Sequence, residues 1–459
     1  MSDSKRTELT ACLDQLRPQI EGILSSMGVI GASLALSDHS GILAELNFGR
    51  KDKELEGAPD RNTMFMIGSC SKSFAALAVM ILVERGKLSL DDEVSRYTRF
   101  TAGKGVTIRQ ILTHTSGIPN LGMSETLIRK LREGKSEPWF DSIDNFYEHA
   151  NGAGDWFFAP GERYIYCNTN YTLAAEVVAN LSGMSYESFV EQEIFTQLSM
   201  NRSCFTKERY DALPNKSKQY FQDGTETPAY FEPVIAGCGG IISCAEDLSR
   251  YLRMFLLEGT LDGVRIIKKE TCEQIKTEFA PMTTAKDLFG SGFGPEFYGL
   301  GFMVYPDYCG VKAVTHSGST GIGSANLFFV PELGFTLSGV CNVSSGESAL
   351  PLIGFLLTAA LKGENFFARL PYFASEAYLV SLCGEYHSYR GIIQRSVKYK
   401  MGMLWLCEGE NERPLVPDAT EDFMPTVFRL YNGPQCFSRV TFLPQGRLLL
   451  ERNLMEKQK

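Results

Sequence analysis

The sequence predicts an α/β (α+β) fold in which both ends of a discontinuous domain form one antiparallel sheet covered by helices. Strand-like runs occur at 29–37 and 42–48, and again at 299–305, 313–315, 324–330 and 335–342. Between them, from about 105 to 290, the apolar spacing is mainly helical. Beyond about 370, short alternating stretches separated by turn residues indicate a small antiparallel β domain. We therefore expect two domains.

The first domain is expected over residues 1–365, with its sheet from about 25–65 and 297–365 and a helical region inserted at about 66–296. A hairpin is expected where turn residues 38–41 separate the first two apolar runs. The run 75–83 is apolar on every face, which is typical of a helix buried all round, and it ends near Arg85-Gly86. Further helices are expected at 106–112, 143–150, 171–181, 185–197, 245–257, 268–279 and 349–361.

The second domain, residues 370–459, is expected to be a small β-barrel or sandwich. Its strand-like stretches are 384–389, 395–400, 404–407, 426–431, 439–442 and 447–451.

Composition excludes several functions. The formal net charge of −9 argues against nucleic acid or an anionic membrane as a partner, because both select clustered lysine and arginine. Twelve cysteines contain no C-x-x-C pair and do not cluster with the five histidines, so we expect reduced thiols and neither a metal nor another cofactor. Without a signal-peptide core or a run of membrane-spanning length, a cytoplasmic location is the default expectation.

The stretch Gly68-Ser69-Cys70-Ser71-Lys72 opens the predicted buried helix. Three residues make almost one helical turn, so the side chains of Ser69 and Lys72 should face the same way. Burial would favour the neutral lysine, which could then take the proton of the serine. The spacing alone is weak evidence, since Ser2 and Lys5 match it in a polar tail.

Two further segments supply groups that suit this chemistry. Tyr166 and Asn168 lie two apart in an irregular stretch before a predicted helix, and a tyrosine held near its anion beside a lysine can act as a base. The asparagine amide can hold both the lysine and a substrate carbonyl. At a predicted strand end, His316-Ser317-Gly318 offers a close backbone approach, and the N–H of Ser319 offers an oxyanion donor.

These motifs resemble those of the serine β-lactamase and penicillin-binding-protein superfamily, in particular its class C-like branch of D-aminopeptidases, family VIII esterases and transesterases. Connecting stretches also resemble this branch and lie in the right order, namely Thr107–Pro119, Pro160-Gly161, Gly239–Ser243, Glu246–Leu248 and Tyr298–Phe302. The resemblance implies the β-lactamase/transpeptidase-like fold and an acyl-enzyme on Ser69. It also implies that Lys72 and Tyr166 share proton transfer and that Asn168, His316, Gly318 and Ser319 bind substrate or its oxyanion. The C-terminal segment is similar to the lipocalin-like extensions of some peptidase members.

One departure bears on the substrate. Where β-lactamases and carboxypeptidases carry a lysine that binds the substrate carboxylate, this chain has His316, which is mostly neutral near pH 7. We expect a serine hydrolase acting on a small molecule, short peptide or ester. A peptidase or amidase that can take D-configured substrates is favoured, and a carboxylesterase or transesterase is the alternative. A β-lactamase or a non-catalytic relative is a weaker alternative, and a homo-oligomer stays an open option.

Other notable residues have simpler interpretations. His114 is expected to brace its own loop rather than touch substrate. Cys70 and Cys167 flank the predicted catalytic residues and are expected to be small buried thiols. Aromatic residues at 139–140 and 156–158 could line an acyl pocket or pack between domains, and the sequence favours neither.

Overall fold

The computed structural model of the chain describes residues 2–103, 105–134, 140–154, 156, 158–282, 292–418 and 424–458. The chain divides into two compact units, which are described separately below. The first comprises Met1–Thr284 and Pro295–Glu364, and the second comprises Ala285–Gly294 and Asn365–Lys459.

The first unit contains an eight-stranded sheet in the order β2-β1-β14-β13-β12-β11-β10-β9, with antiparallel neighbours throughout. The central strands are buried on both faces, which matches their continuous apolar sequence. The predicted sheet from both ends of the domain is therefore confirmed. Its strands are β1 Gly31–Ser37, β2 Ile42–Gly49, β9 Ala280–Pro281, β10 Phe297–Tyr298, β11 Met303–Tyr308, β12 Val311–Ser319, β13 Ser324–Val330 and β14 Phe335–Cys341.

Several strands differ from the prediction. The expected strand at 299–305 is instead β10 and β11, which lie on either side of residues 299–302. β12 continues past Thr315 to Ser319, so the whole of the His316-Ser317-Gly318 motif lies in the sheet and pairs with β13. β9 lies within the stretch expected to be helical, yet it pairs with β10 at the edge of the sheet. A two-residue strand is too short to show the alternation that sequence patterns detect.

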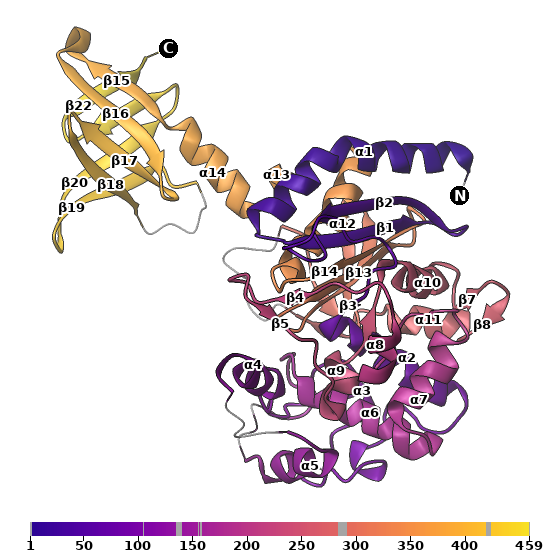
Figure 1. The fold of residues 1–459 in the computed structure, drawn as a ribbon. Helices are drawn as coiled ribbons and strands as arrows, with labels where there is room; N and C mark the ends of the chain where they lie inside the picture. Colours follow the sequence, from indigo (N-terminus) through magenta and orange to yellow (C-terminus); the bar gives the residue numbers. More distant parts are fainter. Residues whose placement is uncertain are drawn as a thin grey trace. The chain divides into compact units, whose positions relative to one another are not determined.

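Helices cover both faces of this sheet (Figure 1). α1 Asp3–Ser26 and α12 Gly346–Leu361 pack together on one face, and α10 Ala245–Leu256 packs on β14 and β1 from the other. Adjacent residues of β14 show the two sides, because Ser338 donates to the Ala245 carbonyl of α10 while Gly339 faces Leu350 of α12.

The inserted region is mainly helical, as predicted, and carries three short two-stranded pairs. They are β3 Phe65–Met66 with β6 Ile242–Ser243, β4 Gln219–Tyr220 with β5 Glu226–Thr227, and β7 Thr260–Leu261 with β8 Val264–Arg265. The predicted helix at 185–197 is instead α7 followed by a π-helical turn over Glu191–Phe195. The remaining helices are α2 Ser71–Glu84, α3 Ile108–Leu112, α4 Met123–Glu133, α5 Ile143–Gly152, α6 Asn168–Ser182, α7 Tyr186–Val190, α8 Lys207–Ala212, α9 Ala236–Gly239 and α11 Lys269–Ile275.

The C-terminal part of the second unit, from Asn365, begins with two helices, α13 Phe366–Arg369 and α14 Pro371–Ser381. Residues from 370 onward were expected to belong to the β domain. Eight consecutive antiparallel strands then close into a barrel, which decides between the barrel and the sandwich. They are β15 Gly384–Ser388, β16 Ile393–Lys400, β17 Met403–Glu408, β18 Asn411–Pro417, β19 Val427–Asn432, β20 Gln435–Leu443, β21 Arg447–Leu450 and β22 Asn453–Lys457.

The interior of this barrel is filled by side chains. Tyr386, Phe428 and Phe442 are among twelve buried apolar residues that form its core, as expected for an eight-stranded barrel of this size. The sequence did not predict β18 or β22, because β18 opens with four exposed residues, Asn411 to Pro414, and so lacks an alternating pattern.

Among the described residues, no helix combines the length and apolar character needed to cross a membrane.

A pair of glycine substitutions tests the packing of α12. A Cβ at Gly354 would lie 2.5 Å from the ring of Phe328, whereas a Cβ at Gly22 in α1 would meet nothing within 4 Å. Alanine is favoured over glycine in a free helix by about 1 kcal/mol, so Gly22→Ala should raise the free energy of unfolding. Gly354→Ala should lower it by about 1–3 kcal/mol because the clash outweighs propensity. Urea denaturation measures both, and equal stabilisation by the two substitutions would contradict this packing.

Candidate active site

Ser69 lies in a short 3₁₀ turn, η1 Gly68–Cys70, that runs directly into α2. Ser69 itself is half-buried, and Lys72 in the first turn of α2 is fully buried. Every residue of α2 from Ser71 to Leu82 is buried, because the sequence is apolar around the whole helix. The predicted buried helix is confirmed, and it ends at Glu84 with Arg85 as its C-cap, close to the predicted end.

Two glycines let β12 approach this turn closely. A Cβ at Gly318 would lie 2.0 Å from the carbonyl oxygen of Ile67 and 2.7 Å from the amide nitrogen of Ser69. Gly68 has a φ of +51°, and a Cβ there would lie 2.7 Å from the backbone of Ser319. A larger residue at either position would force the two segments apart. The contact brings the backbones of Ser69 and Ser319 side by side.

The amine of Lys72 has three hydrogen-bond partners. Its Nζ lies 2.7 Å from the carbonyl oxygen of Cys238, 2.8 Å from Oδ1 of Asn168 and 2.9 Å from Oγ of Ser69. The two carbonyl oxygens can only accept, so Nζ donates to both. A neutral amine has no further N–H bond, and its lone pair is left for the hydroxyl of Ser69. In this state the amine is placed to accept the serine proton.

Burial makes that neutral state accessible. It lowers the pKa of Lys72 from 10.5 to about 8, because the ammonium loses its hydration. The carboxylate of Glu347 acts in the opposite direction, but burial is the largest effect on this pKa. About a tenth of the amine is then neutral at pH 7.

Asn168 is the first residue of α6, and its amide orientation is fixed from both sides. Its Nδ2 donates to Oγ of Ser124 at 3.2 Å, which leaves Oδ1 for Lys72. Its backbone N–H donates to Oδ1 of Asn120 at 3.1 Å. The structure thus places Asn168 against Lys72, while its contact with a substrate stays a prediction.

Tyr166 lies two residues before α6, close to both Ser69 and Lys72. Nζ of Lys72 lies over the ring of Tyr166, 4.7 Å from its centroid, and the side chain of Ser69 lies close enough to the phenol to lower its pKa slightly. Burial raises the pKa of Tyr166 well above its ordinary value of 10.0. The expectation of a tyrosine held near its anion is therefore wrong for the resting site, because burial disfavours the phenolate. The phenol is protonated near neutral pH and can donate that proton.

His316 is fully buried and uses both ring nitrogens within the protein. Nδ1 lies 2.6 Å from the carbonyl oxygen of Ser317, so Nδ1 carries the proton, and Nε2 accepts from the hydroxyl of Tyr298 at 2.9 Å. Burial lowers the pKa of His316 to about 3, so the imidazole is neutral. The ring holds Tyr298 and the end of β12, and a direct contact with substrate stays a prediction.

Together these groups can perform nucleophilic acyl chemistry. The roles that suit this arrangement are nucleophile for Ser69, base for Lys72, which contacts it, and proton donor for Tyr166, which lies beside both. The adjacent backbones of Ser69 and Ser319 make their N–H groups the candidate oxyanion donors. The roles predicted for Gly318 and Ser319 are compatible with this placement and stay predictions.

The cysteines near the site are buried thiols, as predicted. Sγ of Cys70 donates to the carbonyl oxygen of His316 at 3.2 Å, and burial raises the pKa of both Cys70 and Cys167. Neither is a thiolate near neutral pH.

The second S-x-x-K match is a helix cap, since Oγ of Ser2 accepts from the backbone N–H of Lys5. Across the part of the chain that the structure describes, no group of three or more His, Cys, Asp or Glu side chains could hold a metal ion.

The aromatic residues that are described belong to packing in the helical region. Phe140 contacts the ring of His149 at 4.9 Å between centroids, and Trp156 stacks on Phe100 at 6.4 Å. Positions 139 and 157 lie outside the described residues. The contacts described for Phe140 and Trp156 lie within the helical region, and they correspond neither to an acyl pocket nor to the expected packing between domains.

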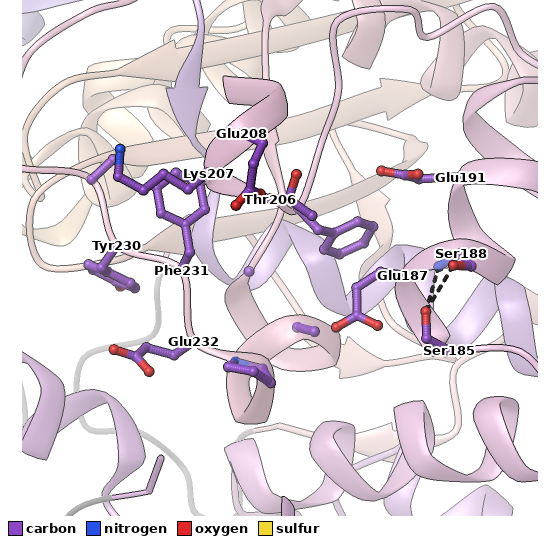
Figure 2. A pocket seen from close by; sticks show the side chains of 15 residues that line it. Ser185, Glu187, Ser188, Glu191, Thr206, Lys207, Glu208, Tyr230, Phe231 and Glu232 are labelled. Carbon is purple, nitrogen blue, oxygen red and sulfur yellow. Dashed lines mark hydrogen bonds between the residues drawn. The ribbon is translucent and has the colours of Figure 1, made fainter. Parts of the chain in front are cut away.

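A groove of about 640 Å³ lies between α7, α8 and the segment 229–233 (Figure 2). Its acidic side chains include Glu191, which pairs with Arg209, and Glu232, which pairs with Lys130. Tyr230 lines this groove, and its hydroxyl donates to the carbonyl oxygen of Thr320, the residue after Ser319. One wall of the groove is thus hydrogen-bonded to the residue that follows β12.

Several residues that hold the site were not predicted. The carbonyl of Cys238 binds Lys72, but a backbone oxygen has no signal in the sequence. Ser124 and Asn120 orient Asn168 from a stretch where no helix was expected. Tyr298 belongs to a stretch that the family resemblance included, so its position could be found, but its bond to His316 could not.

The pKa of Lys72 predicts how the reactivity of Ser69 depends on pH. Below about pH 8 the amine is an ammonium without a lone pair, so the rate of Ser69 modification should rise about tenfold per pH unit. Above this pH the rate should level off. His316, with its pKa of about 3, contributes no step in this range. The measurement is the second-order rate of inactivation by a sulfonyl fluoride between pH 5.5 and 9.5.

Lys72→Arg is the control for this profile, because a guanidinium keeps its proton throughout the range. Its inactivation rate should be low and without the rise toward pH 8. A wild-type profile that is flat from pH 6 to 9 would contradict Lys72 as the base.

Comparison with known proteins gives a family for most of the chain. The family model described as "Beta-lactamase" matches residues 16–361. Penicillin-binding protein 4 of Amycolatopsis lactamdurans is 27% identical over 327 residues, which are 68% of this chain and 81% of that protein. Two relatives from Bacillus subtilis are matched over only 35% and 65% of their own length.

Solved structures show the same fold. The octameric penicillin-binding protein homologue from Pyrococcus abyssi is 29% identical, with a TM-score of 0.74 over 96% of this chain and 99% of that one. A class C β-lactamase aligns with a TM-score of 0.62 and 20% identity over 80% of this chain and 99% of that one. Because the family model covers most of the chain, the protein belongs to the β-lactamase family, whose members are generally serine acyl-transfer enzymes.

Proposed function

We propose that the protein is a serine hydrolase that forms an acyl-enzyme on Ser69 and acts on small amides or short peptides. One observation carries this proposal. Nζ of Lys72 donates to two carbonyl oxygens, and its third hydrogen-bond partner is Oγ of Ser69, 2.9 Å away. A buried amine held in this way is a base aimed at one hydroxyl.

The acylation step follows from this contact. The lone pair of Lys72 takes the hydroxyl proton while Oγ of Ser69 attacks the substrate carbonyl carbon. The carbonyl oxygen gains the electron pair and is stabilised by the N–H groups of Ser69 and Ser319. As the oxyanion collapses, the bond to the leaving group breaks. The leaving group takes the proton of the Tyr166 phenol, which the ammonium of Lys72 replaces.

Deacylation repeats these steps with water as the nucleophile. Lys72, neutral again, takes a proton from a water molecule that attacks the acyl carbon, and the proton returns to Oγ of Ser69 when the ester bond breaks. Free carboxylic acid and the resting enzyme result, so protons balance over the cycle.

The end of β12 supports a substrate without a carboxylate beside the scissile bond. His316 occupies the position where carboxylate-binding relatives carry a lysine, and it is neutral and bonded to Ser317 and Tyr298. A buried neutral imidazole offers no charge to an anion. Neutral or cationic small substrates, D-configured ones included, suit this site better than penicillins.

The protonated phenol of Tyr166 supports an amide over an ester. An amine leaves only when its nitrogen gains a proton, whereas an alkoxide or phenoxide leaves more easily without one. Tyr166 keeps its proton throughout the neutral range and lies beside Ser69. A carboxylesterase or transesterase is the alternative, since the same Ser69 and Lys72 contact would serve an ester.

Turnover of an amide beside an ester tests this proposal. The wild type should release p-nitroaniline from D-alanine p-nitroanilide and p-nitrophenol from p-nitrophenyl butyrate. Ser69→Ala and Lys72→Arg should each lower kcat by at least about a thousandfold, because one removes the nucleophile and the other the base.

The outcomes separate the alternatives. Ester turnover without amide turnover would favour the esterase. Full activity of Ser69→Ala on both substrates would overturn the proposed function, provided that the two proteins have the same melting temperature.

A further inference from the structure

His114 holds the backbone on both sides of Tyr166. Its carbonyl oxygen accepts from the N–H of Ile165 at 2.9 Å, and its ring Nδ1 accepts from the N–H of Cys167 at 3.1 Å. Its ring also packs against that of Tyr166, with centroids 4.4 Å apart. Three contacts from one residue thus fix the position of the Tyr166 phenol.

These bonds also fix the protonation state of His114. A backbone N–H can only donate, so Nδ1 is the unprotonated nitrogen, and Nδ2 of Asn170 lies 3.3 Å from the same atom. The proton therefore sits on Nε2. Burial lowers the pKa of His114 well below its ordinary value, so the ring stays neutral.

His114 holds this position at a cost in stability. Its φ is +57°, in the left-handed region that a residue with a Cβ adopts only under strain. Its Nε2 is fully buried and has no hydrogen-bond partner among the described residues, which leaves a desolvated donor unpaired. The left-handed turn directs both the carbonyl and the ring toward the segment 165–167. Strain maintained beside a site is better explained by positioning than by stability.

We propose that His114 is a positioning residue that holds the Tyr166 phenol at the distance from Ser69 that proton transfer requires. This inference rests on the proposed function, because it assigns His114 to the proton-transfer step of that reaction. It predicts that loss of the Nδ1 acceptor slows the chemical step and leaves substrate binding almost unchanged.

Three substitutions separate the acceptor from the ring. In His114→Asn, Oδ1 takes the place of Nδ1, and asparagine tolerates the left-handed backbone. In His114→Gln the amide reaches the position of Nε2 instead, and His114→Leu has no acceptor. We expect His114→Asn to keep kcat within about threefold, whereas the other two lose about 10- to 100-fold in kcat with KM changed less than about twofold.

A double-mutant cycle shows whether the effect passes through Tyr166. In a Tyr166→Phe background, His114→Gln and His114→Leu should lower kcat by less than about threefold further. Far-ultraviolet circular dichroism and melting temperature confirm the fold of each variant. If His114→Leu fails to fold, the comparison of His114→Asn with His114→Gln carries the test.

The proposal is overturned if His114→Gln keeps wild-type kcat, if the loss appears in KM alone, or if it persists undiminished in the Tyr166→Phe background. Ser69→Ala is measured in parallel on the same amide and ester substrates. If wild type and Ser69→Ala turn over these substrates equally, the proposed function is wrong. If Ser69→Ala is inactive but the His114 variants are as active as wild type, the proposed function stands and only the positioning role of His114 is wrong.

Discussion

The site depends on the burial of one amine. Lys72 is fully buried, and this lowers its pKa from 10.5 to about 8. Holding the ammonium there costs about 3 kcal/mol below pH 8, and the cost disappears above about pH 10.5, where the unfolded chain is also neutral. The same burial that lowers the stability of the fold leaves the amine partly neutral, and therefore basic, near pH 7. A lysine on the surface would rarely be neutral at the same pH.

Three segments far apart in the sequence surround that amine. The turn before α2 supplies Ser69, α9 supplies the carbonyl of Cys238, and the start of α6 supplies Asn168. Closing the sheet against this group requires glycine at two positions, 68 and 318, because any Cβ there would collide with backbone. The sheet and the helical region therefore form the site together.

Much of the architecture could be predicted because it rests on periodicity. The continuous apolar runs of β13 and β14, and the apolar sequence of α2, reflect burial on all sides. The second unit was less predictable. β18 opens with exposed polar residues, and its pairing with β17 depends on tertiary context that no local pattern contains.

The candidate site could also be predicted only in part from the sequence. The spacing of Ser69 and Lys72 on one helical turn predicted a contact that the structure contains. The state of Tyr166 was predicted incorrectly, because its pKa is raised mainly by burial, which is not visible in a motif. His316 illustrates the same limit, since its ring bonds to Tyr298 inside the protein.

The most direct test is to measure the pKa of Lys72 itself. Nuclear magnetic resonance of protein labelled with ¹³C at lysine Cε follows each amine through its titration, and the spectrum of Lys72→Arg identifies the signal of Lys72. We expect one lysine to titrate near pH 8 and to disappear in the variant. A Lys72 signal that titrates at its ordinary value near 10.4 would show that the amine is not desolvated, and would contradict its role as the base that activates Ser69.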